Sequence, residues 1–382
     1  MTTPSGIDGT SREVRIIGTG LIGTSIGLAL RRTGLDPVLQ DQSVTAMTLA
    51  RDLGAGRLGP RLGHDEGSDG GAHPTPDVVV VATPPDITPS VVADALARWP
   101  EATVTDVASV KGVILDDLRR MGAPLARYVG SHPMAGRERS GAIAARPDLF
   151  EGRAWVVCPD DDADAGRVDV VERIARACGS VVTRLTPGEH DAAVAAVSHV
   201  PQVAASLVAA RLEALSEQAV GLSGQGVRDV TRVAASDPGL WTQILSGNAA
   251  SVRAVLTVLR DELDGVIGAL HALEQGIDED APGARAVIAR AIAGGNAGHA
   301  RIPGKHGAAP TSYGVVSVVV GDRPGELARL LADIGEAEVN LEDLRLDHGL
   351  GLPFGVAEVS VLPASVSPLE EALLARGWQL HG

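Results

Sequence analysis

The sequence predicts an α/β protein in three parts: an N-terminal Rossmann-type dinucleotide-binding domain, an all-helical middle domain and a C-terminal βαββαβ ferredoxin-like domain. Strand and helix patterns alternate over residues 14–165 and again over 313–382, which is typical of layered α/β domains. Residues 166–293 show only long helical periods. The glycine- and proline-rich segment 294–312 is expected to be a linker, and residues 1–13 a flexible N-terminus.

Composition limits the classes of protein to consider. A chain of 382 residues is long enough for two or three domains with sizeable cores. Apolar residues make up 45% but aromatic residues only 2%, so the cores should be aliphatic. The net charge of -15 argues against nucleic acid or an anionic membrane as a partner. A small anionic substrate would therefore need its own cationic pocket.

The two cysteines, Cys158 and Cys178, are too few for a disulfide scaffold and lack the spacing of metal ligands. They indicate a reducing compartment. The N-terminal stretch is polar, with neither the apolar region of a signal peptide nor a membrane-spanning segment. We expect a cytoplasmic protein without a metal site.

The N-terminal domain begins with a strand that runs through glycines into an amphipathic helix, "VRIIGTGLIGTSIGLALRRTG" at residues 14–34. This is half of a βαβ unit, and the remaining elements follow in order. Further strands are expected at 37–41, 77–83, 102–109, 128–132 and 154–159, with a helix at 44–56 and a surface loop at 63–76.

Gly18, Gly20 and Gly23 form a GxGxxG pattern, which alone could be an ordinary glycine turn. Here it follows a strand and opens a helix at Leu21 and Ile22, as in a dinucleotide-binding fingerprint. The first glycine allows the tight turn, the second lets the backbone approach a pyrophosphate, and the third allows close helix packing. The helix N-terminus stabilises the phosphates.

Asp41 ends the next strand about twenty residues on, where the ribose hydroxyls of a dinucleotide lie. Its carboxylate would repel a 2′-phosphate, and Gln42 offers no cation to hold one, so NAD is favoured over NADP. An alternative role for Asp41 is the N-cap of the following helix, which does not exclude the first. Thr83 and Pro84, after the strand at 77–83, are further cofactor-binding candidates.

His132 is the candidate catalytic base. Oxidation of an alcohol carbon requires a group that takes the hydroxyl proton as hydride leaves, and histidine has a suitable pKa. The chain has ten histidines, but His132 ends a predicted strand at the cofactor edge of the sheet and is followed by Pro-Met-Ala-Gly. A buried structural histidine is the alternative.

Several motifs then agree in their order along the chain. They are "GTGLIGTSIGLAL", "DVASVKG", "GSHPMAGRERSG", "EHDAAVAAVSHVPQ" and "RDVTRVAASDPGLWTQILSGN". Over residues 14–300 the chain resembles the prephenate dehydrogenase family, including its arogenate-using members. The resemblance implies NAD-dependent oxidative decarboxylation of prephenate to 4-hydroxyphenylpyruvate, carbon dioxide and NADH, on the way to tyrosine.

The resemblance also implies roles for single residues. His132 would accept the proton of the ring hydroxyl, and Ser109 would hydrogen-bond that hydroxyl and orient the histidine. The alternative for Ser109 is a helix N-cap. Arg232 would hold the ring carboxylate, although it could instead pair with Asp229 on one helix face.

Glu138 and Asp229 resemble the acidic residues that pair with such arginines at the pocket entrance. Trp241 resembles an aromatic residue that helps to close the site, in the same subunit or in the neighbouring one. Exposed charges and a core tryptophan are the ordinary alternatives.

The chain departs from the family pattern at one place. Many members read Ser-His-x-Pro-His, whereas "SHVPQ" puts Gln202 where the second histidine is expected. Gln can hydrogen-bond but cannot carry a positive charge, so the choice between prephenate and arogenate stays open. His199 and His190 are further substrate-binding candidates, each weighed against a buried structural histidine.

The middle domain has apolar stripes wide enough to pack against a partner chain, which predicts a homodimer. The last seventy residues resemble an ACT domain, with "DRPGELARLL" as the turn into its first helix. Asp322, Arg323 and Gly325 in that turn are candidate regulatory residues, and tyrosine is a candidate feedback ligand. A dimerisation module without a ligand is the alternative.

Two other functions compete with these interpretations. A different NAD dehydrogenase of similar two-domain build would explain the glycine loop but not "SVKG", "HPMAG" and "DVTR" together. An amino-acid sensor that has lost catalysis would explain the C-terminal domain but not the intact histidine, serine and arginine.

Overall fold

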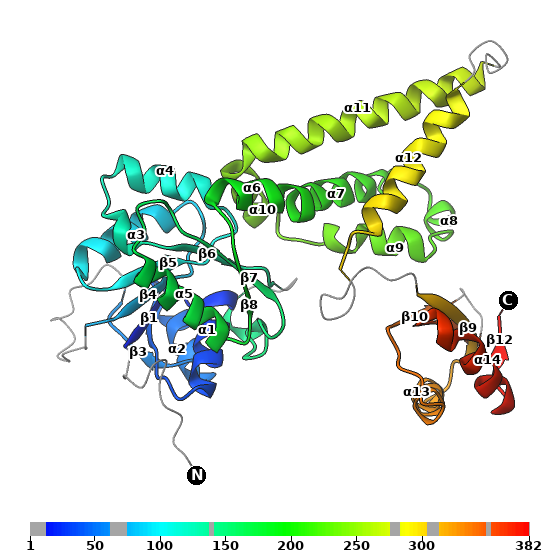
Figure 1. Cartoon of the computed structure of the whole chain (residues 1–382), viewed down its shortest axis with the longest axis horizontal. Coiled ribbons are helices and arrows are strands. Elements are labelled where there is room, and N and C mark those ends of the chain that lie inside the picture. Colours follow the sequence, from blue (N-terminus) through cyan, green and yellow to red (C-terminus); the bar gives the residue numbers. More distant parts are fainter. Residues whose placement is uncertain are drawn as a thin grey trace. The chain divides into compact units, whose positions relative to one another are not determined.

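The computed structural model divides into two compact units, Met1–Leu259 and Arg260–Gly382, each with its own hydrophobic core (Figure 1). It describes residues 13–61, 75–136, 141–275, 283–303, 313–348 and 353–381. The predicted flexible N-terminus, apart from residue 13, and most of the predicted loop at 63–76 lie outside these ranges.

The first unit is built on a five-stranded parallel sheet in the order β3-β2-β1-β4-β5. This is the doubly wound arrangement that the alternating pattern predicts. Its strands are β1 (Val14–Ile17), β2 (Val38–Gln40), β3 (Arg57–Leu58), β4 (Val78–Val81) and β5 (Thr103–Asp106).

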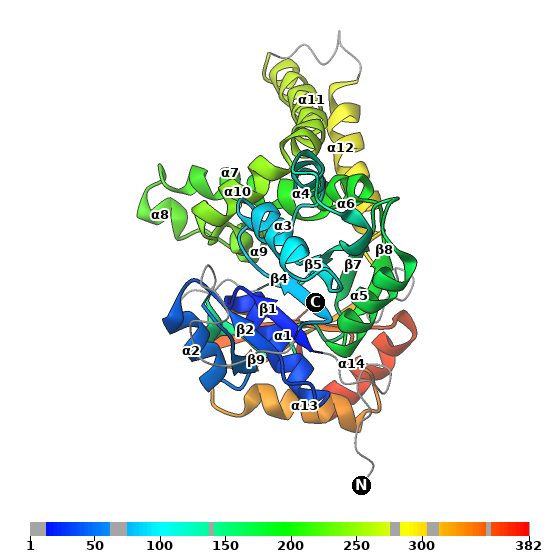
Figure 2. The ribbon, with the colours of Figure 1, turned by 90° about the vertical axis from the view of Figure 1, so that its left-hand side faces the viewer.

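Helices cover both faces of this sheet, and Figure 2 shows β1 and β4 between α1 and α3. The alternation of side chains along β4 explains the two faces. Val78 and Val80 join the core that includes α1, whereas Val79 and Val81 join the core that includes α3. The helices are α1 (Leu21–Arg32), α2 (Val44–Asp52), α3 (Thr88–Arg98) and α4 (Gly112–Arg120).

A second, mixed sheet in the order β6-β7-β8 extends the nucleotide-binding part. Strand β6 runs antiparallel to β7, and a single bridge between Val104 and Tyr128 links this segment to β5. The elements are η1 (Leu125–Arg127), β6 (Gly130–Pro133), η2 (Ala142–Ala144), β7 (Ala154–Cys158), α5 (Ala165–Ala177) and β8 (Val181–Arg184).

The prediction that residues 166–293 are all helical is wrong, because β8 lies within them. Val171 and Ile174 of α5 are buried in the same core as α1, and β8 pairs with β7, so both elements belong to the nucleotide-binding part. Strand β8 was hard to recognise because it is an edge strand whose side chains are mostly exposed, so it has no buried apolar run. The helical part therefore starts later than predicted.

The helical part begins with a continuous rod formed by α6 (Pro187–Val194), a π-helical turn η3 (Ala195–His199) and α7 (Val200–Leu212). By length and composition alone this rod could cross a membrane. It carries the buried polar residues His190, Asp191 and His199, whose side chains bond to other parts of the same chain. The helices that follow are α8 (Glu217–Val220), α9 (Gln225–Thr231), η4 (Arg232–Ala234), α10 (Pro238–Gly247) and α11 (Ala249–Glu274).

The second unit contains the end of α11, then α12 (Ala284–His299) and a four-stranded antiparallel sheet in the order β10-β11-β9-β12. Helix α12 crosses the start of the predicted linker, because the alanine-rich segment up to His299 contains no proline that would stop it. The elements then follow in the predicted βαββαβ order: β9 (Gly314–Gly321), α13 (Glu326–Glu336), β10 (Asp343–His348), β11 (Phe354–Val361), α14 (Val366–Ala375) and β12 (Gln379–Leu380).

Candidate active site

The turn after β1 requires its first glycine. Gly18 has a φ of +100°, and its N–H donates to the carbonyl of Gln40 at 2.8 Å. A Cβ at Gly18 would lie 2.4 Å from the carbonyl oxygen of Ala82 at the end of β4. Only glycine therefore allows the turn to pack against the neighbouring strand.

The other two glycines of the loop play different parts. A Cβ at Gly23 would lie 1.9 Å from the carbonyl oxygen of Gly18, so Gly23 allows the helix to pack on the turn. A Cβ added at Gly20 would meet no other part of the described chain within 4 Å. Gly20 is the N-cap of α1 and provides no side-chain cap, so the N–H groups that begin at Leu21 and Ile22 can receive an anion.

Asp41 is tied to the glycine loop. Its Oδ2 accepts the N–H of Thr19 at 2.6 Å and the Thr19 hydroxyl at 2.8 Å, while Oδ1 accepts the N–H of Ser43 at 2.8 Å. The side chain that caps α2 is Ser43, so the alternative role of Asp41 as that N-cap is not adopted. On the adjacent residue, the carbonyl of Gln42 accepts a hydrogen bond from Nε of Arg61 at 2.9 Å, which brings a cation beside the loop.

Thr83 and Pro84 form the turn from β4 into α3. The Thr83 and Thr88 hydroxyls are 2.9 Å apart, and the carbonyl of Pro84 accepts the Thr88 N–H at 3.1 Å. Because Gly18 approaches Ala82 in the same strand exit, this turn lies beside the glycine loop.

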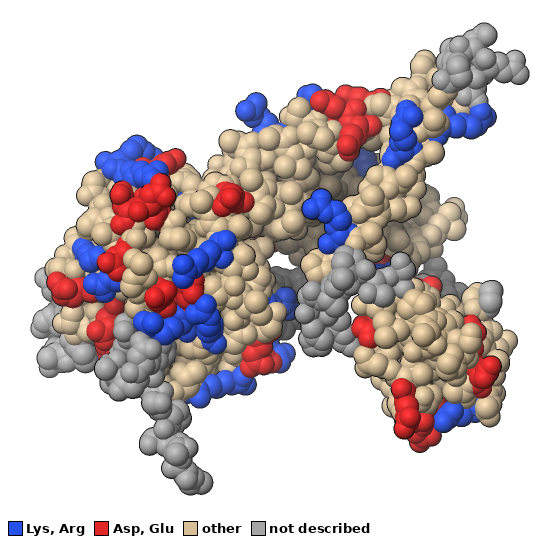
Figure 3. Space-filling view, viewed as in Figure 1, with Lys and Arg blue, Asp and Glu red and all other residues tan. Residues whose placement is uncertain are grey.

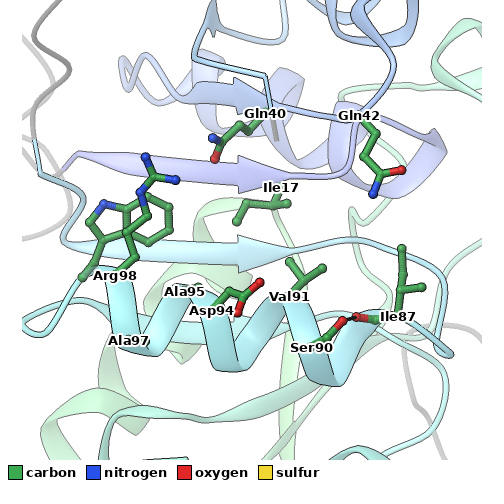
Figure 4. A pocket seen from close by; sticks show the side chains of 11 residues that line it. Ile17, Gln40, Gln42, Ile87, Ser90, Val91, Asp94, Ala95, Ala97 and Arg98 are labelled. Carbon is green, nitrogen blue, oxygen red and sulfur yellow. Dashed lines mark hydrogen bonds between the residues drawn. The ribbon is translucent and has the colours of Figure 1, made fainter. Parts of the chain in front are cut away.

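A pocket of about 620 Å³ runs from the carboxyl edge of the sheet along α3 (Figure 4). Gln42 and Ile87 lie at its outer end, and Gln40 enters from β2. The amide nitrogen and oxygen of Gln40 are buried and have no hydrogen-bond partner within the described residues. An orphaned amide beside Asp41 fits a polar heterocycle such as the adenine of a dinucleotide.

His132 lies on β6, opposite Val156 of β7. Its Nδ1 is 2.9 Å from Nε2 of His190, and the two rings meet edge to face with centroids 5.1 Å apart. Burial is the main cause that lowers the pKa of His132 well below its usual value, and the positive potential of His190, Lys111 and His199 adds to it. His132 is therefore neutral at neutral pH, as a general base must be.

Asp191 ends the chain of contacts behind His132. Nδ1 of His190 is 2.8 Å from Oδ1 of Asp191, and His190 is completely buried. The Asp191 carboxylate also accepts the backbone N–H groups of Lys111 at 2.9 Å and Gly112 at 2.8 Å. Burial alone would raise the pKa of Asp191, but the hydrogen bonds from His190, Gly112 and Lys111 together lower it.

Lys111, whose backbone N–H contacts Asp191, also takes part in a buried ion pair. The ammonium of Lys111 bonds to Asp106, and both side chains are almost fully buried. The Asp106 carboxylate also accepts the Tyr128 hydroxyl at 2.7 Å and the N–H of Ala108 at 2.9 Å. A buried charge persists only when it is paired and hydrogen-bonded. The Asp106–Lys111 pair in "DVASVKG" therefore stabilises the fold next to the site.

The sequence analysis did not single out Asp106, Lys111, Tyr128 or Asp191. Their signal was present in part, because Lys111 and Asp106 interrupt an apolar segment at a strand exit and Asp191 follows a candidate histidine.

Ser109 is half-buried and lies between β5 and α4. Within the described part of the chain no hydrogen bond joins it to His132, and the residue that orients His132 is His190. The N-cap position of α4 is Lys111, so Ser109 is not the N-cap either. Its hydrogen bond to a substrate hydroxyl stays a prediction.

The π-helical turn places His199 on the side of His190. Nine residues apart in a regular α-helix, the two side chains would lie about 180° apart, and one inserted residue reduces this to about 80°. Asn248 contacts both halves of the rod on this side. Its Nδ2 donates to the carbonyl of Asp191 at 2.7 Å and lies 3.2 Å from Nδ1 of His199. The following Pro201 has no N–H for the carbonyl four residues before it, which favours such a break.

Trp241 on α10 meets His199 edge to face, with ring centroids 6.1 Å apart, so the two predicted residues are brought together. Burial is the main cause that lowers the pKa of His199, with Asp191 opposing and His190 adding to it. Gln202 is buried, and its amide bonds to the hydroxyls of Ser206 at 3.3 Å and Ser236 at 3.4 Å. The side chain that replaces the family histidine is thus held by the helical part itself.

Arg232 begins η4 and is exposed, directly after α9, which carries Asp229. Asp229 accepts the amide of Gln225 at 2.8 Å, and within the described residues it forms no ion pair with Arg232. The alternative i to i+3 pair is therefore not formed. Glu138 lies outside the described residues.

The three candidate regulatory residues lie together in the turn between β9 and α13. The N–H of Asp322 donates to the carbonyl of Pro353 at 2.9 Å, and that of Arg323 to the carbonyl of Gly321 at 2.8 Å. Gly325 is the N-cap of α13 with a left-handed φ of +94°. The side chains of Asp322 and Arg323 are exposed.

Two family models match the chain in series. The prephenate dehydrogenase nucleotide-binding domain matches residues 26–184, and the prephenate dehydrogenase dimerization domain matches residues 186–280. The boundary between them coincides with the end of β8.

Curated relatives and solved structures agree with these matches. The chain is 37% identical to the probable prephenate dehydrogenase NovF of Streptomyces niveus over 372 residues, which covers 96% of this chain and 99% of the relative. It is 32% identical to the prephenate dehydrogenase of Bacillus subtilis, over 62% of this chain and 64% of that protein.

The structure resembles that of prephenate dehydrogenase from Aquifex aeolicus in complex with hydroxyphenyl propionate and NAD+, with a TM-score of 0.58 and 28% identity over 71% of this chain and 93% of that one. Synechocystis arogenate dehydrogenase shares the fold, with a TM-score of 0.56 and 24% identity over 70% of this chain and 98% of that one. From its motifs, its site geometry and these relatives, the chain belongs to the prephenate dehydrogenase family.

Proposed function

We propose that the protein is an NAD-dependent prephenate dehydrogenase that converts prephenate to 4-hydroxyphenylpyruvate, carbon dioxide and NADH in tyrosine biosynthesis. The observation that carries this proposal is a neutral, half-buried His132 whose Nδ1 is held by His190 at 2.9 Å. Its other nitrogen is left to accept a proton. The strand that carries His132 belongs to the second sheet, and the neighbouring Ser131 hydroxyl donates to the carbonyl of Asp106 at the end of β5 at 2.8 Å.

The chemistry follows from this arrangement. The ring hydroxyl of prephenate transfers its proton to His132 as hydride leaves the same carbon, and NAD, when bound, accepts the hydride. Loss of the ring carboxylate as carbon dioxide makes the ring aromatic, and the phenolate oxygen takes a proton back. Ser109, two residues before Lys111, is proposed to hydrogen-bond the ring hydroxyl of the substrate. The half-buried Trp241 beside His199 is proposed to exclude water from the site.

The residues fit the cofactor. Gly20 leaves space for the pyrophosphate at the uncapped start of α1, Asp41 is fixed where it can bind the ribose hydroxyls, and the orphaned Gln40 amide lines the adjacent pocket. Thr83 and Pro84 supply the neighbouring turn.

Arg232 is proposed to hold the ring carboxylate of the substrate, with Glu138 and Asp229 at the entrance. Arg232→Gln should raise KM by about 10- to 100-fold and change kcat less, since a guanidinium–carboxylate bond contributes to binding before the reaction. Arg228→Gln, one turn earlier on α9, is the control. An unchanged KM would contradict the assignment.

The direct test measures initial rates of NADH formation with prephenate and with arogenate, each repeated with NADP. His132→Asn should lower kcat by about 10²- to 10⁴-fold with little change in NAD affinity. His271→Asn, which changes an exposed histidine, is the matched control. Turnover of His132→Asn near that of the unchanged protein would refute the base assignment.

Arogenate is the second candidate substrate. The reason to test it is Gln202, which stands where many members of the family have a histidine. An amide in place of histidine cannot provide a positive charge for the side-chain carboxylate. The Gln202→His variant should therefore shift the ratio of kcat/KM towards prephenate. An unchanged ratio would remove Gln202 from the determinants of specificity.

We infer further that the protein is a homodimer through its helical part. Exposed apolar side chains on this part support the proposal: Val197, Leu207, Leu222, Val230 and Val258 are each more than half exposed. In the view of Figure 3, charges of both signs are interspersed over the nucleotide-binding part, whereas few mark the start of α11. Light scattering should give twice the chain mass of 39.1 kDa, and Leu207→Glu should lower it.

Residues 313–382 are proposed to form an ACT-like regulatory module that binds tyrosine as a feedback ligand. The βαββαβ order and the exposed turn with Asp322, Arg323 and Gly325 support this proposal. Tyrosine should slow the initial rate, and Asp322→Ala should weaken the inhibition without changing the uninhibited rate. A rate that does not respond to tyrosine would contradict feedback binding. It would favour the alternative, a dimerisation module that binds no ligand.

The protein is proposed to work in the cytoplasm, as its two buried free thiols and its relatives' biosynthetic role suggest.

A further inference from the structure

We propose that His190 and Asp191 form a two-step hydrogen-bond relay that determines which nitrogen of His132 acts as the base. The relay rests on the proposed reaction and adds two positioning residues to it. It replaces the expectation that His190 binds the substrate, because His190 has no exposed surface and both of its ring nitrogens have protein partners.

The direction of the relay follows from Asp191. A carboxylate only accepts hydrogen bonds, so Nδ1 of His190, 2.8 Å from Oδ1, must carry the hydrogen. In the relay His190 holds its one ring hydrogen on Nδ1 and accepts at Nε2, so Nδ1 of His132, 2.9 Å away, is the donor. Nε2 of His132 is left with its lone pair, which is the form that can take a proton from the substrate hydroxyl.

Asp191 is kept ionised by α4. The N–H groups of Lys111 and Gly112, at 2.9 and 2.8 Å, point at its two oxygens from the start of that helix, where the helix dipole favours an anion. A Cβ on Gly112 would lie 2.9 Å from Oδ2, so a larger residue here would require the Asp191 carboxylate to shift. The carboxylate is thus fixed from three sides, by two backbone groups and His190.

The relay also stabilises the product of proton transfer. When His132 receives the substrate proton it becomes a cation in a buried site, which costs free energy unless an anion compensates. Asp191 supplies that anion through one intervening ring. The neighbouring Lys111 opposes this effect, but its ammonium is paired with Asp106, which weakens its positive potential at His132.

The first test locates the ring hydrogen of His132 directly. In the unchanged protein, ¹⁵N NMR of labelled histidine at slightly alkaline pH should show His132 protonated at Nδ1 and unprotonated at Nε2. The Asp191→Asn variant can present an amide N–H to His190, which would reverse both rings and place the hydrogen of His132 on Nε2. A His132 that carries its hydrogen on Nε2 in the unchanged protein would overturn the proposal.

The second test is kinetic. Asp191→Asn should lower kcat by about 10²- to 10⁴-fold with NAD affinity kept within about twofold, because a wrong tautomer cannot act as the base. His190→Gln should also lower kcat, and the double variant should be no slower than Asp191→Asn alone, since both act through one chain of contacts. Asp116→Asn, the same chemical change at an exposed position of α4, is the control.

The outcomes separate this proposal from the proposed reaction. If the unchanged protein oxidises neither prephenate nor arogenate, the reaction is wrong, yet the NMR result still decides the relay. If it turns over and the losses from His190→Gln and Asp191→Asn add fully, or lie in KM, the relay is wrong and the reaction stands.

Discussion

Gly112 and Asp191 join the nucleotide-binding part to the helical part through one hydrogen bond of 2.8 Å between the Gly112 N–H and Oδ2 of Asp191. The two residues are 79 positions apart in the chain. The contact attaches the start of α4 to α6, and it is the same carboxylate that contacts His190. Asp191 therefore contributes both to the contact between the two parts and to the position of His190 behind the catalytic histidine.

Gly112→Ala should lower kcat about tenfold or more, because the added Cβ, 2.9 Å from Oδ2, would displace the Asp191 carboxylate. NAD affinity should change little. Gly188→Ala, on α6 where nothing lies within 4 Å of the added atom, is the matched control. Steady-state rates of both variants check this, and equal kcat values for them would show that Asp191 tolerates displacement.

Two substitutions in the glycine loop should separate stability from cofactor binding. Gly20→Ala should keep the Tm, since its backbone angles (φ -73°, ψ -161°) suit alanine and nothing lies within 4 Å, but should weaken NAD binding about tenfold or more. Gly23→Ala should lower stability by about 1–3 kcal/mol or more, because its Cβ would lie 1.9 Å from a backbone oxygen. Calorimetric unfolding and NAD titration check both, and a low Tm for Gly20→Ala would contradict the open space.

The pH dependence of kcat/KM should report the low pKa of His132. Burial holds that pKa well below 6.5, so the base is neutral at neutral pH and is lost only when the pH falls below its own pKa. The rate should therefore be flat around neutral pH and decline on the acid side, below the usual histidine range. Profiles from about pH 5 to about pH 9 test this. An acid limb centred above 6.5 would show that substrate raises the pKa or that another group is the base.

Asp41→Ala should weaken NAD use by about 10- to 100-fold and make NADP a competing cofactor. The carboxylate that repels a 2′-phosphate would be gone, while Arg61 would remain beside Gln42 to attract one. The ratio of kcat/KM for NAD to that for NADP measures the effect, with Asp52→Ala on α2 as the control. A ratio that stays unchanged would place the discrimination elsewhere.

The parts of the fold that were predictable from sequence have strong local signals. The run of four valines in β4 and the glycines after β1 predict a parallel sheet with a phosphate loop, because burial on both faces and left-handed turns restrict the residue types. Strand β8 was missed for the opposite reason, since an exposed edge strand of four residues leaves no such restriction.

The site was predictable as a set of residues but not as a set of contacts. His132 and His190 were both singled out, yet their hydrogen bond joins positions 58 apart and no local pattern indicates it. The pairing of Lys111 with Asp106 was missed because charged residues near a strand end are usually solvated. In the fold both are buried, Asp106 at the end of β5 and Lys111 directly before α4.

The π-helical turn at Ala195–His199 also changes the meaning of the broad apolar pattern in the rod from Pro187 to Leu212. The extra residue offsets the angular phase of the second half by about 100°, so residues of the two halves that would share a face of a regular helix lie on different faces. The first half places His190 against His132, and the second half leaves Leu207 exposed. A one-residue deletion within the turn would therefore restore a single helical phase and remove His199 from the side of the rod that carries His190.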